Sequence, residues 1–428
     1  MKLNNITFPF DDFAKEMAKL KNEKHFDYLV TIVGEDFGEE GLGCIYILEN
    51  TQTHDRMSVK QIARQIGEDY VLPTIFSIWR DGELLEREVY DFLGIKFLGH
   101  PDMRRLYLRN DFDGYPLRKD YDMSPEHNRF PETDEPETDW TEEYNLNKYG
   151  ELVKTTRRLI QPDEFTVNIG PNHPSTHGVL RLQTVLDGEQ IVHVFPHLGY
   201  IHRGIEKMCE DYTYPQTLAL TDRLNYLSAM MNRHALVGVI EEAMGIELSD
   251  RIHYIRTIMD ELQRLDNHLL FTGCCAQDLS ALTAFLYGMR DREHVLNVME
   301  ETTGGRLIEN YYRIGGCQAD IDPHFVQNVK DLCKYLRPMI QEYLDVFGDN
   351  VITHQRFEVS DRWDLMIVSI MPLQVLPEGL PDGKTTSVNI IHTTYMIRWN
   401  GKSVSVIMVT QWIVIMFILT RCIRVWIL

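Results

Sequence analysis

The sequence predicts an α+β chain built from two folded parts that an acidic linker joins. Three observations lead to this prediction. Residues 1–121 alternate strand-like and helix-like runs, residues 122–143 are rich in acidic side chains and proline, and residues 203–347 carry apolar positions at helical spacing. A chain of 428 residues is also too long for one ordinary hydrophobic core, so more than one domain is expected.

Within residues 1–121 the clearest strand signals are two short apolar runs. Tyr28 to Val33 and Gly43 to Leu48 are expected to be buried strands. Met57 to Ile66 is a candidate for a short helix, and Ile75 to Ile78 is expected to lead into another strand. These elements predict a small α/β or α+β domain.

Residues 122–155 are expected to form a solvated linker. Between 122 and 143 there are nine acidic side chains, one arginine and three prolines. A segment of this composition buries little apolar surface, so we expect it to be extended in water.

A short antiparallel sheet followed by helices is expected after the linker. The strand runs are 165–168, 180–185 and 191–195, with Asp187-Gly188 as a hairpin turn. Two long amphipathic helices packed on each other are predicted from apolar residues at three-to-four spacing. The positions in the first are Leu224, Leu227, Met231, Ala235, Leu236, Val239 and Ala243, and those in the second are Ile252, Ile255, Ile258, Met259, Leu262, Leu265 and Leu269.

Composition excludes several classes of function. Lysine and arginine number 43 against 64 acidic residues, and a net charge of −21 repels phosphate backbones, so nucleic acid is not an expected partner. The seven cysteines include no C-x-x-C pair, which argues against a zinc ribbon or an iron–sulfur cluster ligated by this chain alone. They are expected to be reduced thiols. Residues 1–19 mix acidic and apolar residues, unlike a secretory signal.

The segment from 86 to 120 combines carboxylates and guanidinium groups with glycine and proline turns. It reads E-R-E-V-Y-D-F-L-G-I-K-F-L-G-H-P-D over 86–102, continues as Arg104-Arg105 and ends in G-Y-P-L-R-K-D. Arginine–carboxylate pairs fix orientation well. A catalytic interpretation would make His100 a base, but no nucleophile stands near it in the sequence. We therefore expect a structural or docking role.

Two histidines, His173 and His177, stand in the run G-P-N-H-P-S-T-H-G at 170–178. Pro174 between them prevents the shared helix face of a zinc protease motif. A loop can present a side chain into a cavity, although a loop histidine is more often an ordinary turn residue. The flanking glycine and proline residues favour a well-positioned side chain.

Two further motifs carry candidate site residues. P-H-L-G-Y-I-H-R-G-I-E at 196–206 is followed by D-R-L-N-Y at 222–226, and Arg223 and Tyr226 are expected on one side of a helix that begins there. A tyrosine at a helix start is, by itself, more often a packing residue. Asp278 ends the helix that carries His268, where a carboxylate could pair with an imidazole or cap the next helix; spacing alone favours the cap.

Together these motifs resemble respiratory NADH-quinone oxidoreductase, complex I. Residues 1–120 resemble its C-type, or 30-kDa, component through E-R-E-x-x-D-x-x-G-x-x-F-x-G-H-P-D and G-x-P-L-R-K-D. Residues from about 156 to 358 resemble its D-type, or 49-kDa, component through G-P-x-H-P-S-T-H-G, P-H-L-G-Y-I-H-R-G-x-E and D-R-L-x-Y. The resemblance implies a fused C/D chain with domains at 1–121 and 156–358 and a linker at 122–155.

The resemblance also implies a site. The 49-kDa component is related to the large subunit of nickel–iron hydrogenases, with the metal site lost and its cavity given to quinone. This relation implies a small sheet and a helical bundle of that kind. Carried over by motif, His177 and Tyr226 would contact the quinone head group, with His173 in the same loop. Asp278 would pair with the histidine, and Arg203 and Arg223 would lie near a [4Fe–4S] cluster held by a neighbouring subunit.

The function implied by the resemblance is that of a peripheral-arm subunit of a proton-translocating enzyme on the cytoplasmic face of a bacterial inner membrane. Quinone would be its substrate, and the iron–sulfur and membrane-arm subunits of the complex would be its partners. No G-x-G-x-x-G follows a strand, so NADH should bind another subunit. One alternative is a catalytically inactive docking scaffold that has lost its C-terminal part. A hydrogenase-like metalloenzyme is disfavoured because both C-x-x-C pairs are missing.

Residues 359–428 do not resemble the 49-kDa component. Read two bases further on, however, codons for 373–384 can encode T-G-P-S-G-R-A-S-G-W-K, and those for 384–399 can encode N-D-V-R-K-H-H-P-Y-D-V-Y-D-K-V, both typical of that component at this place. We therefore hypothesise a frameshift near residue 358. On this hypothesis the uncharged run 403–420, near the length of a membrane span, is an accident of frame. Independent nucleotide reads with an uninterrupted frame over codons 350–370 would exclude it.

Overall fold

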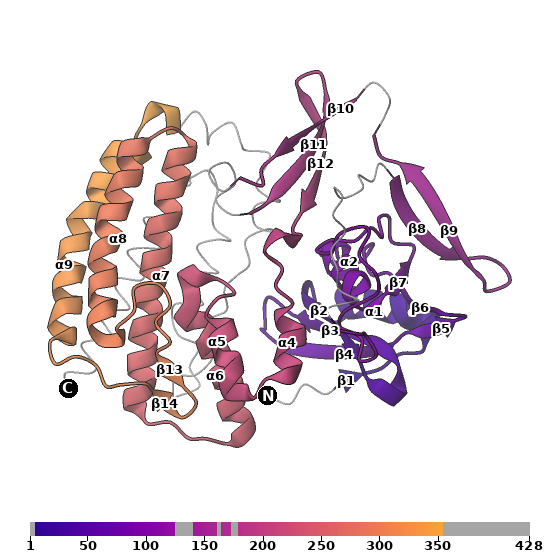
Figure 1. Ribbon diagram of the computed structural model, residues 1–428, viewed down its shortest axis with the longest axis horizontal. Helices are drawn as coiled ribbons and strands as arrows, with labels where there is room; N and C mark the ends of the chain where they lie inside the picture. The colour runs from indigo at the N-terminus through magenta and orange to yellow at the C-terminus, as the bar shows by residue number, and fades with distance from the viewer. Residues whose placement is uncertain (1–4, 125–139, 161–163, 173–178, 354–428) are drawn as a thin grey trace. The chain divides into compact units, whose positions relative to one another are not determined.

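The computed structural model describes residues 5–124, 140–160, 164–172 and 179–353. The chain divides into two compact units after Asp211, here called the N-terminal and the C-terminal unit. The observed architecture is α+β, as predicted, with several small sheets in the N-terminal unit and a helical bundle in the C-terminal unit (Figure 1). The acidic residues 122–155 therefore do not mark the division between the two units.

The first sheet of the N-terminal unit has the strand order β1-β4-β3-β2. Its strands are β1 (Asn5–Ile6), β2 (Tyr28–Asp36), β3 (Leu42–Glu49) and β4 (Arg56–Ile62). The two apolar runs predicted to be strands are thus confirmed as β2 and β3. The helix expected over 57–66 is wrong, because β4 pairs antiparallel with β3 along its whole length. Pairing with a neighbour distant in sequence overrides the local helical pattern.

The second sheet has the order β5-β6-β7-β8-β9. Its strands are β5 (Arg64–Ile66), β6 (Asp69–Pro73), β7 (Ile95–Leu98), β8 (Trp140–Leu146) and β9 (Leu152–Arg158). The β8–β9 hairpin lies within the predicted linker, so an extended solvated chain is wrong for residues 140–155. Residues 125–139 lie outside the described part of the chain.

The expectation that Ile75 to Ile78 lead into another strand is also wrong, because residues 76–78 form a turn and helix α2 (Gly82–Leu93) follows. The side chain of Glu86 accepts the backbone N–H of Ile75 at 2.7 Å and the hydroxyl of Thr74 at 2.6 Å. These bonds take the place of a strand partner. Since Glu86 is fully buried, burial raises the pKa of its carboxyl group to about 8.

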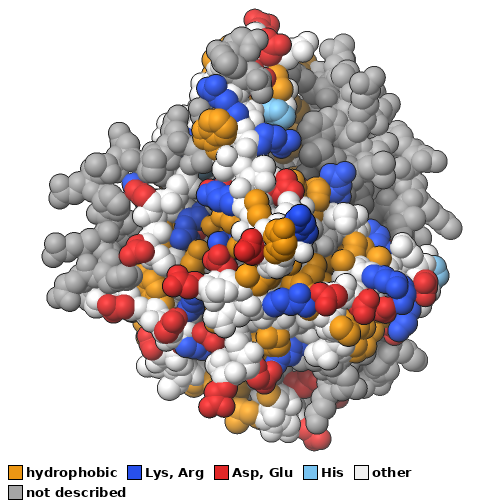
Figure 2. All heavy atoms as spheres, turned by 90° about the vertical axis from the view of Figure 1, so that its right-hand side faces the viewer, with side chains coloured by type: hydrophobic (Ala, Val, Ile, Leu, Met, Phe, Trp, Pro, Cys, Tyr) orange, Lys and Arg blue, Asp and Glu red, His pale blue; other side chains and the backbone are white. Residues whose placement is uncertain are grey.

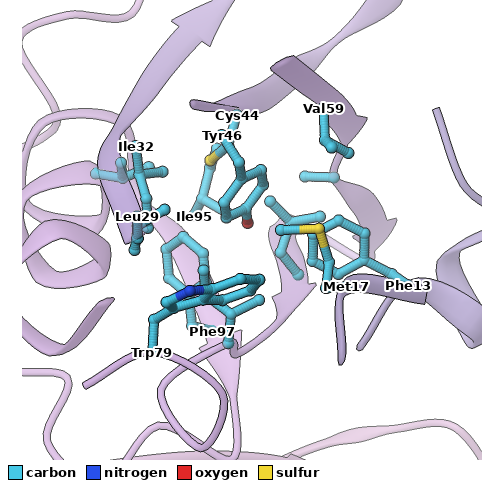
Figure 3. Packing of buried hydrophobic residues seen from close by; sticks show 14 of the residues in the cluster. Phe13, Met17, Leu29, Ile32, Cys44, Tyr46, Val59, Trp79, Ile95 and Phe97 are labelled. Carbon is cyan, nitrogen blue, oxygen red and sulfur yellow. The ribbon is translucent and has the colours of Figure 1, made fainter. Parts of the chain in front are cut away.

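Helices α1 (Phe13–Asn22) and α2 (Gly82–Leu93) pack with the two sheets around one core. Helix α1 buries Phe13, Met17 and Leu20, which recur at three-to-four spacing. Figure 3 shows Trp79, Ile95 and Phe97 in the same core as Phe13, whose ring lies 5.2 Å from that of Tyr46 between centroids. Two 3-10 turns, η1 (Phe10–Asp12) and η2 (Gly38–Glu40), complete this region.

The predicted antiparallel sheet is confirmed as β10 (Phe165–Ile169), β11 (Arg181–Asp187) and β12 (Gln190–His197). The hairpin turns at Gly188, whose φ of 62° suits a residue without a side chain. The 3-10 turn η3 (Gly199–Ile201) and helix α4 (Ile205–Asp211) follow. All of these elements belong to the N-terminal unit.

The C-terminal unit is a bundle whose longest helices lie side by side (Figure 1). Its elements are α5 (Tyr214–Thr221), η4 (Tyr226–Ser228), α6 (Ala229–Met244), α7 (Asp250–Asp278), α8 (Leu282–Thr303), β13 (Tyr312–Arg313), β14 (Gly316–Cys317), α9 (Phe325–Tyr343) and the short π-helix η5 (Leu344–Gly348). The apolar face predicted for α7 is confirmed, since it supplies Ile255, Met259, Leu262 and Leu269 to the core.

The apolar face predicted for α6 is wrong. Of the predicted stripe, Leu224 precedes the helix and is 58 % exposed, and Val239 within the helix is 65 % exposed. The helix instead buries a face that includes Arg233 and Glu241. These two charges can be buried because each has an ionic partner inside the unit, Asp222 and Arg256 respectively.

Acidic and basic side chains are interspersed on the face drawn in Figure 2, with apolar side chains between them. No large patch of one sign gathers among the described residues on this face. The excess of 64 acidic over 43 basic residues is therefore not concentrated there.

Candidate functional site

Tyr226 is the first residue of the turn η4, between α5 and α6. The residue before it, Asn225, has an extended backbone with φ of −135°, and its side chain accepts the N–H of Leu227 at 3.2 Å. Asparagine commonly begins a turn in this way. The side chain of Tyr226 remains 48 % exposed, so its phenol group is open to a ligand.

Arg223 and Tyr226 do not share a helix face, contrary to the prediction. Arg223 follows the end of α5 and donates back to the carbonyl of Ala219 at 2.5 Å, whereas α6 begins only at Ala229. The extended Asn225 interrupts the helical path between the two residues. Both Arg223 and Tyr226 are nevertheless exposed on the same short connection.

The aspartate of the D-R-L-N-Y motif has a structural partner. Asp222 is 1 % exposed, and both of its carboxylate oxygens accept hydrogen bonds of 2.6 Å from the guanidinium of Arg233 on α6. Arg233 also donates to the carbonyl of Tyr312 at 3.0 Å. Through these hydrogen bonds the buried guanidinium of Arg233, on α6, connects the residue that follows α5 with strand β13.

Asp278 is the last residue of α7 and is exposed. It does not occupy the N-cap of α8, because that position is Ala281. The cap favoured by spacing is therefore wrong: the chain makes a further turn through Ser280, whose φ is 65°, before α8 begins. His173 and His177 lie outside the described residues, so the pairing of His177 with Asp278 stays a prediction.

Arg203 belongs to the N-terminal unit, in an exposed turn between η3 and α4. The motif around it packs against residues of the 86–120 segment. The ring of His202 stacks on Phe92 with 5.0 Å between centroids. Gly199 lies so close to the backbone of Tyr107 that a Cβ atom there would come within 1.7 Å of the carbonyl oxygen. A glycine is therefore required at position 199.

The 86–120 segment has the structural role that we expected. Asp91 is fully buried, and one of its oxygens accepts the N–H groups of Leu106, Tyr107 and Leu108 at 3.1, 2.7 and 2.9 Å. Its other oxygen accepts from Arg105 at 2.9 Å. These contacts fold the segment back onto α2.

His100 is unsuited to general base catalysis in this position. Its ring is fully buried; Nδ1 accepts the N–H of Asp102 at 3.1 Å, which leaves Nε2 to donate to the carbonyl of Glu83 at 3.0 Å. Burial lowers the pKa of His100 to about 4, so the imidazole is neutral near pH 7. The ring has a structural role, since it links the backbone of Glu83 to that of Asp102 through two hydrogen bonds.

Sequence reasoning missed a group of buried acids in the C-terminal unit. Burial raises the pKa of Glu309 to about 7 and that of Asp266 to about 6, although Arg292 pairs with Asp266 at 2.9 Å. Glu309 accepts from the side-chain amide of Gln263 at 3.3 Å. An acidic residue between apolar neighbours, as in L-I-E-N-Y-Y at 307–312, is the signal that could have revealed it.

The described residues contain no group of three or more histidine, cysteine, aspartate or glutamate side chains placed to hold a metal ion. The six cysteines of this part of the chain are free thiols. None of the described helices combines the length and the apolar character needed to cross a membrane. The uncharged run 403–420 lies outside the described residues.

Comparison with known proteins matches two families to different parts of the chain. Residues 6–127 match the family described as respiratory-chain NADH dehydrogenase, 30 Kd subunit, and residues 278–360 match the family described as respiratory-chain NADH dehydrogenase, 49 Kd subunit. A relative from Phocaeicola vulgatus, a C/D subunit of NADH-quinone oxidoreductase, is 54 % identical over 355 residues, covering 82 % of this chain and 67 % of the relative. The chain belongs to this C/D family.

Other members of the family are similar over the same extent. The C/D subunit of NADH-quinone oxidoreductase from Bacteroides thetaiotaomicron is 52 % identical, covering 80 % of this chain and 66 % of its own length. A C/D subunit from Aquifex aeolicus is 36 % identical, with 81 % and 61 % covered. A solved chain of the archaeal membrane-bound sulfane sulfur reductase has 26 % identity and a TM-score of 0.45, covering 46 % of this chain and 53 % of its own. This C/D chain thus spans about two thirds of the length of its curated relatives.

Proposed function

We propose that this C/D chain forms part of the quinone pocket of a membrane-bound NADH-quinone oxidoreductase and holds the quinone head group during its reduction. The observation that carries the proposal is the placement of Tyr226, an exposed phenol on a turn whose flanking residues join a buried network. The names of the relatives support the same reaction. The complete activity needs the other subunits of such an enzyme.

The chemistry of the proposed site follows from its residue types. Reduction of a quinone by two electrons adds negative charge to its two oxygens, and each oxygen then takes up a proton. A tyrosine hydroxyl, with a reference pKa of about 10, and an imidazole, at about 6.5, can both donate hydrogen bonds and protons to those oxygens. In the proposal Tyr226 serves one oxygen and His177, in the loop with His173, serves the other. Asp278 would hold the tautomer of His177 and favour its protonated form.

The electrons are proposed to come from a [4Fe–4S] cluster that a neighbouring subunit holds. Arg203 and Arg223 are exposed side chains of motifs that the resemblance assigns to the vicinity of this cluster. A guanidinium group stays charged at any physiological pH, and positive charge beside a cluster favours the reduced, more negative state of the cluster. We therefore assign both arginines to the surface that faces this neighbour.

The partners proposed for the chain are the iron–sulfur subunits of the peripheral arm and the subunits of the membrane arm, with the chain itself peripheral to the membrane. The alternative is a docking scaffold without catalysis. The exposed apolar side chains of α6, such as Val239, are consistent with docking in either case. Activity measurements on the site residues separate the two proposals.

Changing Tyr226→Phe or His177→Ala is expected to lower quinone reduction by about a hundredfold, since each change removes a proton donor. The measurement is the NADH:quinone oxidoreductase rate of the assembled complex that contains this chain. Tyr214→Phe is a matched control, because Tyr214 is a 70 % exposed tyrosine of the same unit outside the proposed site. Normal rates in both site variants, with normal assembly, would show that the head-group assignment is wrong.

A further inference from the structure

Helix α6 lacks an ordinary N-terminal cap. Its N-cap residue, Ser228, makes no side-chain hydrogen bond to the N–H groups of the first turn. The first N–H groups of a helix have no partner inside the helix, so a buried helix start requires an acceptor from elsewhere. This start is buried, because Ser228 and Met230 are each only 1 % exposed.

Helix α7 supplies the missing acceptor. The side-chain oxygen Oε1 of Gln263 accepts the N–H of Met230 at 2.7 Å and that of Met231 at 3.3 Å. Gln263 is 1 % exposed, so these bonds are shielded from water. A side chain of one helix thus caps the start of another.

The hydroxyl that would normally cap α6 is occupied. One turn further along α7, Asn267 donates from Nδ2 to the Oγ of Ser228 at 3.0 Å. Gln263 and Asn267 therefore hold two successive parts of the connection that begins with Tyr226 and enters α6. Asn232, in the first turn of α6, also holds this connection, because its side-chain amide donates to the carbonyl of Asn225 at 3.1 Å.

A hydrogen bond to Glu309 fixes the orientation of the Gln263 side-chain amide. Its Nε2 donates to the carboxyl group of Glu309 at 3.3 Å, so its oxygen must face the N–H groups of α6. Glu309 is itself 4 % exposed and lies after the end of α8. The turn at Tyr226 is thereby connected through one side chain to the interior of the bundle.

We propose that Gln263 and Asn267 are positioning residues for Tyr226, which cap α6 from α7 and so fix the phenol hydroxyl toward the bound quinone. This inference rests on the proposed function of Tyr226. The two residues touch no substrate and act only through the turn. Small displacements of a reacting group lower a rate far more than they lower binding. Their loss should therefore reduce kcat while it leaves KM nearly unchanged.

The test is a double-mutant cycle in the assembled complex that contains this chain. Gln263→Met keeps the length of the side chain and removes its hydrogen bonds. We expect it to lower kcat for quinone reduction roughly tenfold when Tyr226 is present. In the Tyr226→Phe background the same change should lower kcat by less than about twofold, because the group being positioned is already gone.

Two substitutions of Asn267 provide a second comparison, in which one removes a hydrogen bond and the other can restore it. Asn267→Leu removes the bond to Ser228, whereas Asn267→Asp can restore it, because the serine hydroxyl can donate to a carboxylate. We expect Asn267→Leu to lower kcat and Asn267→Asp to recover most of it. Thr272→Val is the control: Thr272 is a buried α7 residue that bonds within its own helix, to the carbonyl of His268 at 2.7 Å.

Full additivity of Gln263→Met and Tyr226→Phe, or an equal loss in Asn267→Asp and Asn267→Leu, would overturn the positioning role. A normal kcat in Tyr226→Phe alone would instead overturn the quinone role of Tyr226, and that result is read from the single variant. The two failures are therefore distinguishable.

Discussion

Replacing Asp91 by alanine is expected to destabilise the N-terminal unit by about 3–5 kcal/mol, the cost of removing one partner of a buried charged network. The carboxylate accepts three backbone N–H groups and one guanidinium hydrogen bond. In the variant the buried N–H group of Leu106 and the partly buried N–H groups of Tyr107 and Leu108 lose their acceptor, and Arg105 loses its ionic partner. The segment that Asp91 holds should open first.

Hydrogen–deuterium exchange of the full chain measures this opening directly. The amides of Leu106, Tyr107 and Leu108 should exchange roughly a hundredfold faster or more in Asp91→Ala. The control is Asp69→Ala, because Asp69 pairs with Lys96 at 2.8 Å but is 42 % exposed, and a surface pair contributes less than about 1 kcal/mol. Equal protection in the two variants would refute a structural role for Asp91.

The second large effect is expected for Arg233→Met, which should destabilise the C-terminal unit by about 3–5 kcal/mol. Arg233 is 2 % exposed and bonds to both oxygens of Asp222, to the carbonyls of Tyr312 and Leu218 and to the side chain of Asn310. Methionine can fill much of the same space, but it leaves the Asp222 carboxylate buried without a counter-charge. That uncompensated charge is the main cost.

A combined variant tests this reason. Asp222→Asn together with Arg233→Met removes the buried charge and should recover part of the stability lost in Arg233→Met alone. Arg251→Met is the control, since Arg251 pairs with Asp320 at 2.7 Å where both side chains are about half exposed or more, at 48 % and 66 %. Thermal unfolding of the full chain, with exchange of the amides of α5 and α6, provides the measurement. If Arg233→Met alone were as stable as the Arg251→Met control, the expected destabilisation would be contradicted.

The elements that could be predicted from the sequence are those whose pattern is local. Strands β2 and β3 and the core face of α7 carry their apolar residues at the spacing of the final structure. Helix α6 could not be predicted in the same way, because its buried face contains Arg233 and Glu241. Their burial depends on Asp222 and Arg256, which a hydrophobic pattern does not reveal.

The β8–β9 hairpin was missed for a related reason. It buries little beyond Thr141 and Tyr144, so its sequence is as polar as a linker. The hairpin is instead held by antiparallel pairing from Trp140 to Arg158, and β8 adds to β7 in a sheet formed by strands far earlier in the chain. Such pairing leaves only a weak trace in local composition.

The candidate site was found through motifs rather than through the chemistry of single residues. Tyr226 taken alone is an ordinary exposed tyrosine. Its assignment to the candidate site depends on the D-R-L-N-Y motif and on the family to which the chain belongs. Gln263 and Asn267 were missed because polar residues on an amphipathic helix are normally assigned to the solvent side. Only the three-dimensional arrangement reveals that both contact the start of α6.

In the function proposed for this chain, Tyr226 and the loop that carries His177 contact a quinone. Photochemical cross-linking of the enzyme complex that contains this chain measures this contact, with a quinone analogue that bears a photoreactive group on its head. After digestion, mass spectrometry should find the label on peptides that contain Tyr226 or residues 173–178, and an excess of unmodified quinone should abolish the labelling. If the label that unmodified quinone abolishes were found only on other subunits, with none on either of these peptides, then Tyr226 and this loop would not contact the quinone.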